Sequence, residues 1–142
     1  MKTKTLVLSL FVILNLTAST LFAAIVSNRV TEAARELDDI VKKMDIKSIA
    51  PNAARLFKLE TALIEKVMIE RKATLSALVC AKLISEKTGV SIDKVIEANP
   101  DRDWSKALKN AEIADSAILE EIDTVHAEFA FFALEFREKR RK

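Results

Sequence analysis

Glycine, proline, tyrosine and cysteine are scarce in this 142-residue chain, which has one glycine, two prolines, one cysteine and no tyrosine. Strands are joined by turns that favour glycine and proline, and so few of these residues cannot supply the turns of a sheet of many strands. The lone Cys80 excludes an internal disulfide, and it lies too far from the N-terminal end to be a lipid-modified cysteine. With His126 it makes only two Cys or His side chains, too few for an ordinary zinc site. One glycine also excludes a glycine-rich phosphate loop.

Charge is missing from a long stretch near the N-terminus. Lys2 and Lys4 precede an uncharged segment that is most apolar from Leu6 to Leu16 and then becomes rich in small residues. This order is typical of a secretory signal peptide, and we expect residues 1–24 to be removed. An uncleaved anchor is the alternative, because about 20 apolar residues span a bilayer as a helix. The remainder is expected to be periplasmic or secreted or, if the anchor stays, to be held at the inner membrane facing the periplasm.

An excess of one sign of charge is also missing once the leader is removed. The full chain has a formal net charge of +2, and the loss of Lys2 and Lys4 leaves equal numbers of acidic and basic side chains. No strong overall field therefore attracts nucleic acid or a membrane. The local exception is the basic tail from about residue 137, which has five positive charges against one negative.

Apolar residues at helical spacing are present along almost the whole remaining chain. One amphipathic stripe follows Ser27, a residue type that suits an N-cap, and runs from Val30 to Met44. The stretch 45–52 contains Pro51 and predicts the first break, because proline is tolerated in the first turn of a helix but not inside it.

The middle of the chain predicts one long helix and one short helix. The apolar pattern from about Ala53 to Ile84 is unusually long for a globular protein, and it could divide near Arg71 to Thr74. Gly89 supplies the left-handed residue that commonly closes a helix. Ser91 then caps a short helix that Pro100 ends.

The last pattern is an apolar seam of coiled-coil type, with alternating steps of four and three residues: Ile118, Ile122, Val125, Phe129, Phe132 and Phe136. Four of the seven phenylalanines lie within residues 129–136, more than one narrow seam can hide. Phe131 is therefore expected to face a second surface, on another helix or on a partner chain. We predict an all-α domain over residues 25–142, a bundle of three to four amphipathic helices with the first and last paired.

The segment from Leu83 to Ala98 has the form of a helix-turn-helix, with Gly89 in the turn. In DNA-binding versions the second helix enters the major groove, and basic residues contact phosphate. Here the second helix and the residues directly after it are predominantly acidic: Asp93, Glu97, Asp101 and Asp103. Phosphate would repel these side chains, so a packing corner is the favoured interpretation and no nucleic-acid partner is expected.

Residues 101–112 resemble a calcium loop in the spacing of some oxygen-bearing side chains. The glycine needed at the sixth position is replaced by Lys106, so the sharp bend of such a loop is not expected. The simpler interpretation is that Asp101 or Asp103 caps the helix that begins near Trp104. Cation binding by this stretch stays an open alternative.

A resemblance covers about a quarter of the chain, from Leu75 to Asn110. Its matching positions are Ala81-Lys82, Thr88-Gly89-Val90-Ser91, Val95-Ile96 and Trp104. The segment resembles one found in small exported bacterial helical proteins of uncharacterised function. It differs in having Ser105 after the tryptophan and Pro100 in the spacer, where glycine is usual. The resemblance implies a helical corner packed on a tryptophan, and it implies no activity.

Catalytic groups are sparse. A nucleophilic Cys80 would need His126 or another base beside it, and Cys80 stands in an apolar stretch typical of a small core residue. The acidic pairs Asp38-Asp39 and Glu120-Glu121 diverge by about 100° on a helix, so neither pair is expected to share a proton. No catalytic, cofactor or metal residue is therefore assigned.

These patterns predict an exported, non-enzymatic protein that acts through helix–helix contacts in the bacterial envelope, bound to a protein partner or to a second copy. The expected surface consists of aromatic and basic residues near the C-terminus: Phe129, Phe131, Phe132, Phe136, Arg137, Lys139, Arg140, Arg141 and Lys142. The alternative is a membrane-tethered binding module with a helix-turn-helix-like corner, whose basic tail contacts lipid or another acidic surface.

Overall fold

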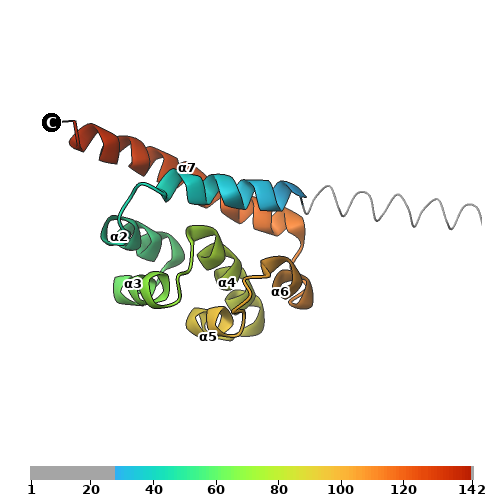
Figure 1. Ribbon diagram of the computed structural model, residues 1–142. Coiled ribbons are helices and arrows are strands. Elements are labelled where there is room, and N and C mark those ends of the chain that lie inside the picture. The colour runs from blue at the N-terminus through green and yellow to red at the C-terminus, as the bar shows by residue number, and fades with distance from the viewer. Residues whose placement is uncertain (1–27, 142) are drawn as a thin grey trace, which may run out of the picture.

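The computed structural model describes residues 28–141, which are arranged as seven helices without a strand (Figure 1). A helix over residues 28–41 comes first, and six more follow: α2 (Ile46–Phe57), α3 (Thr61–Glu70), α4 (Leu75–Thr88), α5 (Ile92–Glu97), α6 (Trp104–Asn110) and α7 (Asp115–Lys139). The all-α class is confirmed, and the expected number of three to four helices is wrong. The predicted leader, the predicted N-cap Ser27 and Lys142 lie outside the described residues.

The long helix predicted between Ala53 and Ile84 is in fact parts of α2, α3 and α4. Lys58 ends α2 in the left-handed conformation, with φ 53°, and its N–H donates to the carbonyl of Ala54. No glycine or proline in the sequence marks this break between α2 and α3. The division expected near Arg71 to Thr74 is present, and the Thr74 hydroxyl caps α4 by accepting the N–H of Ala77.

The break predicted within residues 45–52 overlaps the observed one only at Asp45, and Pro51 lies inside α2. The chain turns earlier, at residues 42–45, and Asp45 caps α2 by accepting the N–H of Ser48 at 2.8 Å. This hydrogen bond holds the pKa of Asp45 below its usual range. A strong cap places the start of the helix, and one proline removes a single hydrogen bond from it.

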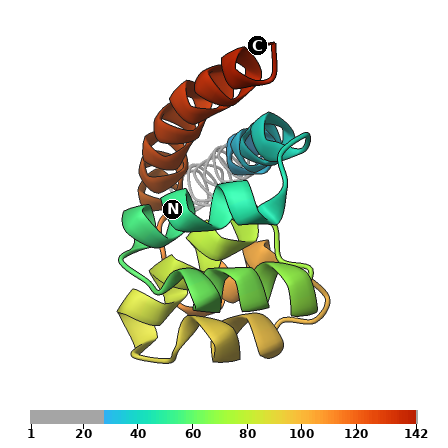
Figure 2. The same ribbon diagram turned by 90° about the vertical axis from the view of Figure 1, so that its left-hand side faces the viewer.

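The helices form two groups in space. The helix over residues 28–41 and α7 lie beside each other on one side of the molecule, and α2 to α6 lie on the other (Figures 1 and 2). Thr31 and Asp115 line one hollow near the start of both helices, and Ile40 and Phe136 line another near their far ends. The two helices therefore run in the same direction.

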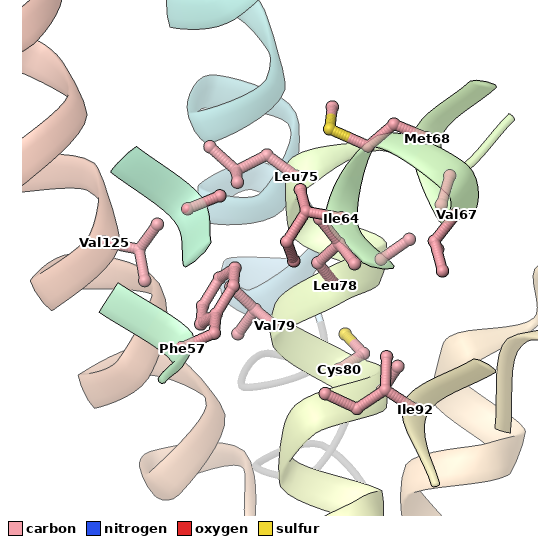
Figure 3. Close-up of a cluster of buried hydrophobic side chains, with 14 of the residues drawn as sticks. Phe57, Ile64, Val67, Met68, Leu75, Leu78, Val79, Cys80, Ile92 and Val125 are labelled. Atoms are coloured by element: carbon pink, nitrogen blue, oxygen red, sulfur yellow. The ribbon is translucent and has the colours of Figure 1, made fainter. Parts of the chain in front are cut away.

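Helix α4 is the centre of the core. Seven consecutive residues from Leu75 to Ala81 are buried, and so is Ile84. The first half of α4 is buried on all sides and must have neighbours on all sides, and α4 contacts α5, α6 and α7. Figure 3 shows side chains of α4 among those of the other helices: Phe57, Ile64, Val67, Met68, Ile92 and Val125.

A hydrogen-bonded contact joins the first helix to α4. Both carboxylate oxygens of Asp38 accept hydrogen bonds from Ser76, one from its N–H at 2.9 Å and one from its hydroxyl at 2.6 Å. Ser76 is in the first turn of α4, where unpaired N–H groups favour an anion. Among residues 28–141, none of the helices is long and apolar enough to cross a membrane.

Candidate functional site

Helix α7 has a fully buried inner face. Ile118, Ile122, Val125 and Phe129 are at most 1% exposed, and Ala133 follows them at 7%. These positions repeat the steps of four and three predicted for the seam. The seam from Ile118 to Phe129 therefore belongs to the core of this chain, whereas the last two predicted seam residues, Phe132 and Phe136, are only partly buried.

The aromatic cluster at the end of α7 is divided between core and surface. The rings of Phe129 and Phe132 meet edge to face, with centroids 6.2 Å apart and planes at 87°. Phe136 is partly buried beside a small hollow that Ile40 and Met44 also line. Arg140 lies over the Phe136 ring, 5.4 Å from its centroid, in a cation–π contact.

The outer face of α7 carries two large exposed apolar side chains. Phe131 is 66% exposed and Leu134 is 59% exposed, and they follow each other by three residues on one face of the helix. Ala127, also exposed, precedes Phe131 by one turn on the same face. We call the face formed by Ala127, Phe131 and Leu134 the outer patch. No residue among 28–141 covers it.

The nine predicted surface residues therefore separate into groups. Phe129 is buried, and Phe132 and Phe136 are partly buried, so the prediction that the four phenylalanines form one surface does not match their placement. Of the four, Phe131 alone stands in the outer patch. The basic residues Arg137, Lys139, Arg140 and Arg141 are exposed, whereas Lys142 lies outside the described residues. Leu134 was missed, although its spacing of three from Phe131 is a helical signal.

Charge is unevenly distributed along α7. Five acidic residues and no lysine or arginine occur from Asp115 to Glu128, whereas four basic residues and one acidic residue occur from Phe136 to Arg141. Two of the acidic groups have partners on other helices, because Glu121 accepts from Lys82 at 2.7 Å and Glu128 accepts from Arg55 at 3.1 Å. The outer patch lies between an acidic half and a basic end.

The corner at Gly89 is formed by packing. Gly89 ends α4 with φ 75°, and the three apolar residues of the next helix, Ile92, Val95 and Ile96, are buried. Asp93 points toward α3, where Lys66 lies at 3.3 Å and Arg71 at 3.8 Å. The acidic side chain predicted to oppose phosphate is thus part of the contact between α3 and α5.

Beneath this corner is a hollow of about 440 Å³, between the end of α4, α5 and α6. Its lining is mixed, with Ile84 and Val95 on one side and Lys94, Asp101 and Lys106 among its polar groups. No single charge or ligand chemistry dominates there.

Residues 101–112, which resemble a calcium loop in sequence, contain the N-terminal cap of α6. Asp103 caps α6 by accepting the N–H of Lys106 at 3.1 Å, which confirms the capping role predicted for one of the two aspartates. Arg102, just before it, adopts a left-handed conformation with φ 58°. Within residues 28–141, no three Cys, His, Asp or Glu side chains gather as a metal site would require.

Cys80 is buried on α4, and burial raises the pKa of its thiol to about 12, with the charge of Asp38 adding to the effect. It lines a hollow of about 270 Å³ together with Trp104 and Ile118. His126 lies on α7, and no hydrogen bond joins the two side chains in the described part of the chain. A thiol with this pKa is protonated at neutral pH, so it is a poor nucleophile.

No protein-family model, curated protein or solved structure matches the chain. The resemblance of residues 75–110 to small exported bacterial helical proteins stays a prediction.

Proposed function

We propose that this protein is a non-enzymatic interaction protein of the bacterial envelope, and that the outer face of α7 is its docking surface for another helix. One observation carries the proposal: two large apolar side chains, Phe131 and Leu134, stand exposed on a face whose opposite side is fully buried. Exposed apolar side chains that gather on one face commonly mark interaction sites. A partner helix covering them would remove both from water.

The placement of Phe131 supports a functional role for this face. The inner face of α7 already supplies the core with Phe129 and with the isoleucines and valine of the seam. Phe131 adds nothing to that core, because it projects on the other side of the helix. A large exposed aromatic ring has no stabilising role within the described residues, whereas aromatic residues are frequent in the centres of protein interfaces.

Export is the second part of the proposal, and it is supported by the sequence of residues 1–24, with its basic start and apolar run. Sequencing the N-terminus of fractionated protein tests it. A chain beginning near residue 25 in the periplasm or the medium is expected. An intact Lys2 and Lys4 in the membrane fraction would instead support the tethered alternative, and a cytoplasmic full-length chain would contradict export.

Site-specific photo-crosslinking in cells tests the docking surface. A photoreactive amino acid at position 131 is expected to form covalent protein adducts. The matched control is position 90, because Val90 is also an exposed apolar residue, 41% exposed, but lies at the α4–α5 corner. Adducts at position 90 and none at 131 would indicate that the docking surface is the α4–α5 corner and not α7. Adducts at neither position would contradict the proposal, and lipid adducts from positions 137–141 would support the tethered module.

A further inference from the structure

We infer that the helix which docks on the outer face of α7 is α7 of a second copy, and that the two helices pair in antiparallel orientation. This inference rests on the proposed function, because it names the partner of the same surface. Its basis is the order of charges along α7: residues 115–128 include five acidic side chains and no lysine or arginine, whereas residues 135–141 include four basic side chains and the two acidic ones Glu135 and Glu138. Only antiparallel pairing sets the end of the acidic half of each copy, at Asp123, against the basic end of the other.

The helix dipole does not explain this order of charges by itself. Acidic residues near a helix N-terminus and basic residues near its C-terminus stabilise the helix, but the effect fades within the first and last turns. Glu120 and Asp123 lie beyond the first turn of α7. Both are exposed, and neither forms an ion pair with another residue of 28–141. Lys139 and Arg141 are exposed and equally unpaired at the other end.

The spacing of two of these charges suits a two-fold axis. Asp123 and Arg141 are separated by 18 residues in the sequence, which is five full helical turns at 3.6 residues per turn. They therefore project from the same edge of α7. A two-fold axis midway between Phe131 and Leu134 sets Phe131 of one copy against Leu134 of the other. The same axis brings Asp123 to within one residue, about 1.5 Å along the helix, of the level of the second copy's Arg141.

The outer face is open along its whole length. Thr124, Ala127, Phe131, Leu134 and Glu138 are all exposed, and the small Ala127 near the centre would allow close approach of a second helix. The buried residue Phe129 lies about 200° around the helix from Phe131, at 100° per residue. The body of each copy thus lies on the far side of its own α7, and the C-terminal part of α7 extends beyond the other helices (Figures 1 and 2).

Parallel pairing of the same faces is disfavoured by the charges. It would place Glu120 and Asp123 of one copy beside the same acidic residues of the other, and basic ends beside basic ends. Like charges across an interface oppose association, whereas complementary charges select orientation and register. The patch is small, so we expect a weak dimer that dissociates on dilution and on addition of salt.

A charge-swap experiment on the mature chain tests the pairing. Asp123→Lys alone and Arg141→Glu alone are each expected to lower the dimer association constant by about tenfold in low salt, because each creates like-charge contacts at both symmetric ends. The double variant Asp123→Lys with Arg141→Glu is expected to restore the wild-type constant to within about threefold. Sedimentation over a range of concentrations measures the constants, and circular dichroism shows that each variant keeps its helix content.

Three outcomes would overturn the inference. The wild-type chain could remain a monomer at every concentration reached. Both single variants could associate as well as the wild type. The double variant could be as weak as the single ones, which would mean that the two side chains do not face each other.

Cysteine pairs test the orientation directly. The proposed axis sets Ala127 of one copy opposite Glu138 of the other. Chains with Ala127→Cys and chains with Glu138→Cys, carrying different tags, are expected to form a mixed disulfide when oxidised together. In this register the two copies of residue 127 are about 16 Å apart along the helix, at 1.5 Å per residue, beyond the about 7 Å that a disulfide can span between Cα atoms. A preference for the disulfide between two Ala127→Cys chains would therefore indicate parallel pairing and overturn the inference.

The photo-crosslinking experiment separates this inference from the proposed function. Adducts from position 131 with twice the mass of the chain support both. Adducts with a different protein, together with a monomeric purified chain, leave the docking surface standing and overturn self-association. Absence of any protein adduct from position 131 overturns both.

Discussion

Cys80 is the one thiol of the chain, and its surroundings suppress its reactivity. Burial raises its pKa to about 12. At pH 8 only about one molecule in ten thousand would carry a thiolate, against roughly one in ten for an unperturbed cysteine with a pKa near 9.

We expect the native protein to react with a disulfide reagent at pH 8 at least about 100-fold more slowly than the urea-unfolded protein. Stopped-flow absorbance measures both rates, and a free-thiol peptide carrying the sequence around Cys80 serves as the control. Labelling of the folded chain as fast as the peptide would show that Cys80 is accessible.

Lys82 is a partly buried cation whose pKa results from opposing effects. Burial alone would lower its pKa, but the hydrogen bond and negative charge of Glu121, with a smaller contribution from Glu86, raise it above 10.5 overall. A cation with a raised folded-state pKa contributes stability that is fully present below the unfolded pKa. That stability is lost as the pH rises through the folded pKa.

The free energy of unfolding should therefore fall above about pH 10.5, and Lys82→Gln should remove this part of the fall. The raised pKa of Cys80 also makes the folded protein less stable from about pH 9 upward. The chain with Lys82 and the chain with Lys82→Gln are therefore compared in a Cys80→Ala background. Urea unfolding between pH 7 and 11.5 gives the profiles. Identical pH profiles for the Cys80→Ala chain and its Lys82→Gln derivative would contradict the role of the Glu121 pair.

At the scale of whole elements, the chain uses left-handed residues to separate its helices, and only one of them is glycine. Within residues 28–141, Gly89 has φ 75°, and four other residues have φ between 53° and 58°: Lys58, Lys72, Arg102 and Glu112. The left-handed region is disfavoured by about 1–2 kcal/mol for a residue with a Cβ atom. These positions therefore retain strain that glycine would relieve.

Reciprocal substitutions test this strain. Gly89→Ala is expected to destabilise the protein by about 1 kcal/mol, with Gly89→Asn intermediate, because asparagine tolerates this conformation better. A Cβ atom at position 89 would meet nothing within 4 Å, so the effect would come from the backbone alone. Lys58→Gly is expected to stabilise by up to about 1 kcal/mol. Chemical denaturation gives both values, and a destabilised Lys58→Gly chain would contradict the argument.

The same residues explain which elements could be predicted from the sequence. The end of α4 was recognisable because Gly89, a chemical stop signal, follows its apolar periodicity. Helix α5 and the seam of α7 were recognisable from periodicity, although Ser91 accepts no cap hydrogen bond and α7 begins after Ala114 without a side-chain cap. The end of α2 was missed, because Lys58 carries no sign that it is left-handed. Pro51 suggested a helix break where there is none, because the Asp45 cap, earlier in the chain, determines where α2 begins.

The candidate site on α7 could also be predicted only in part from the sequence. The sequence indicated that Phe131 faces away from the seam, and the structure leaves it exposed. Periodicity alone could not decide that Phe129 is fully buried while Phe136 lies at the edge under Arg140. That difference depends on where the first helix ends beside α7, which is a tertiary property.

For the whole molecule, Asp38 joins the first helix to the start of the central helix. Its two hydrogen bonds to Ser76 also place a negative charge at the N-terminus of α4. Bonds of this kind to a charged acceptor contribute about 1.5–3 kcal/mol each, with partial overlap when they share one carboxylate.

We expect Asp38→Ala to lower the free energy of unfolding by about 2–3 kcal/mol. The neighbouring Asp39→Ala is a matched control, because Asp39 has only an exposed contact with Arg35 at 3.6 Å and should change stability by less than about 0.5 kcal/mol. Urea denaturation followed by circular dichroism measures both. Equal effects of the two substitutions would mean that the Asp38 contact does not hold the first helix in place.

The shared direction of the first helix and α7 bears on how a tethered protein would stand. Residue 28 lies at the end of the molecule where α7 begins, and Arg141 lies at the opposite end (Figure 1). A 25-residue helix such as α7 is about 37 Å long at 1.5 Å per residue. If the leader stayed in the bilayer and the molecule stood upright on it, the cationic tip would point away from those lipids. In that orientation the basic tail would not contact the membrane that holds the leader, which sets this geometry against the lipid contact predicted for a tethered module.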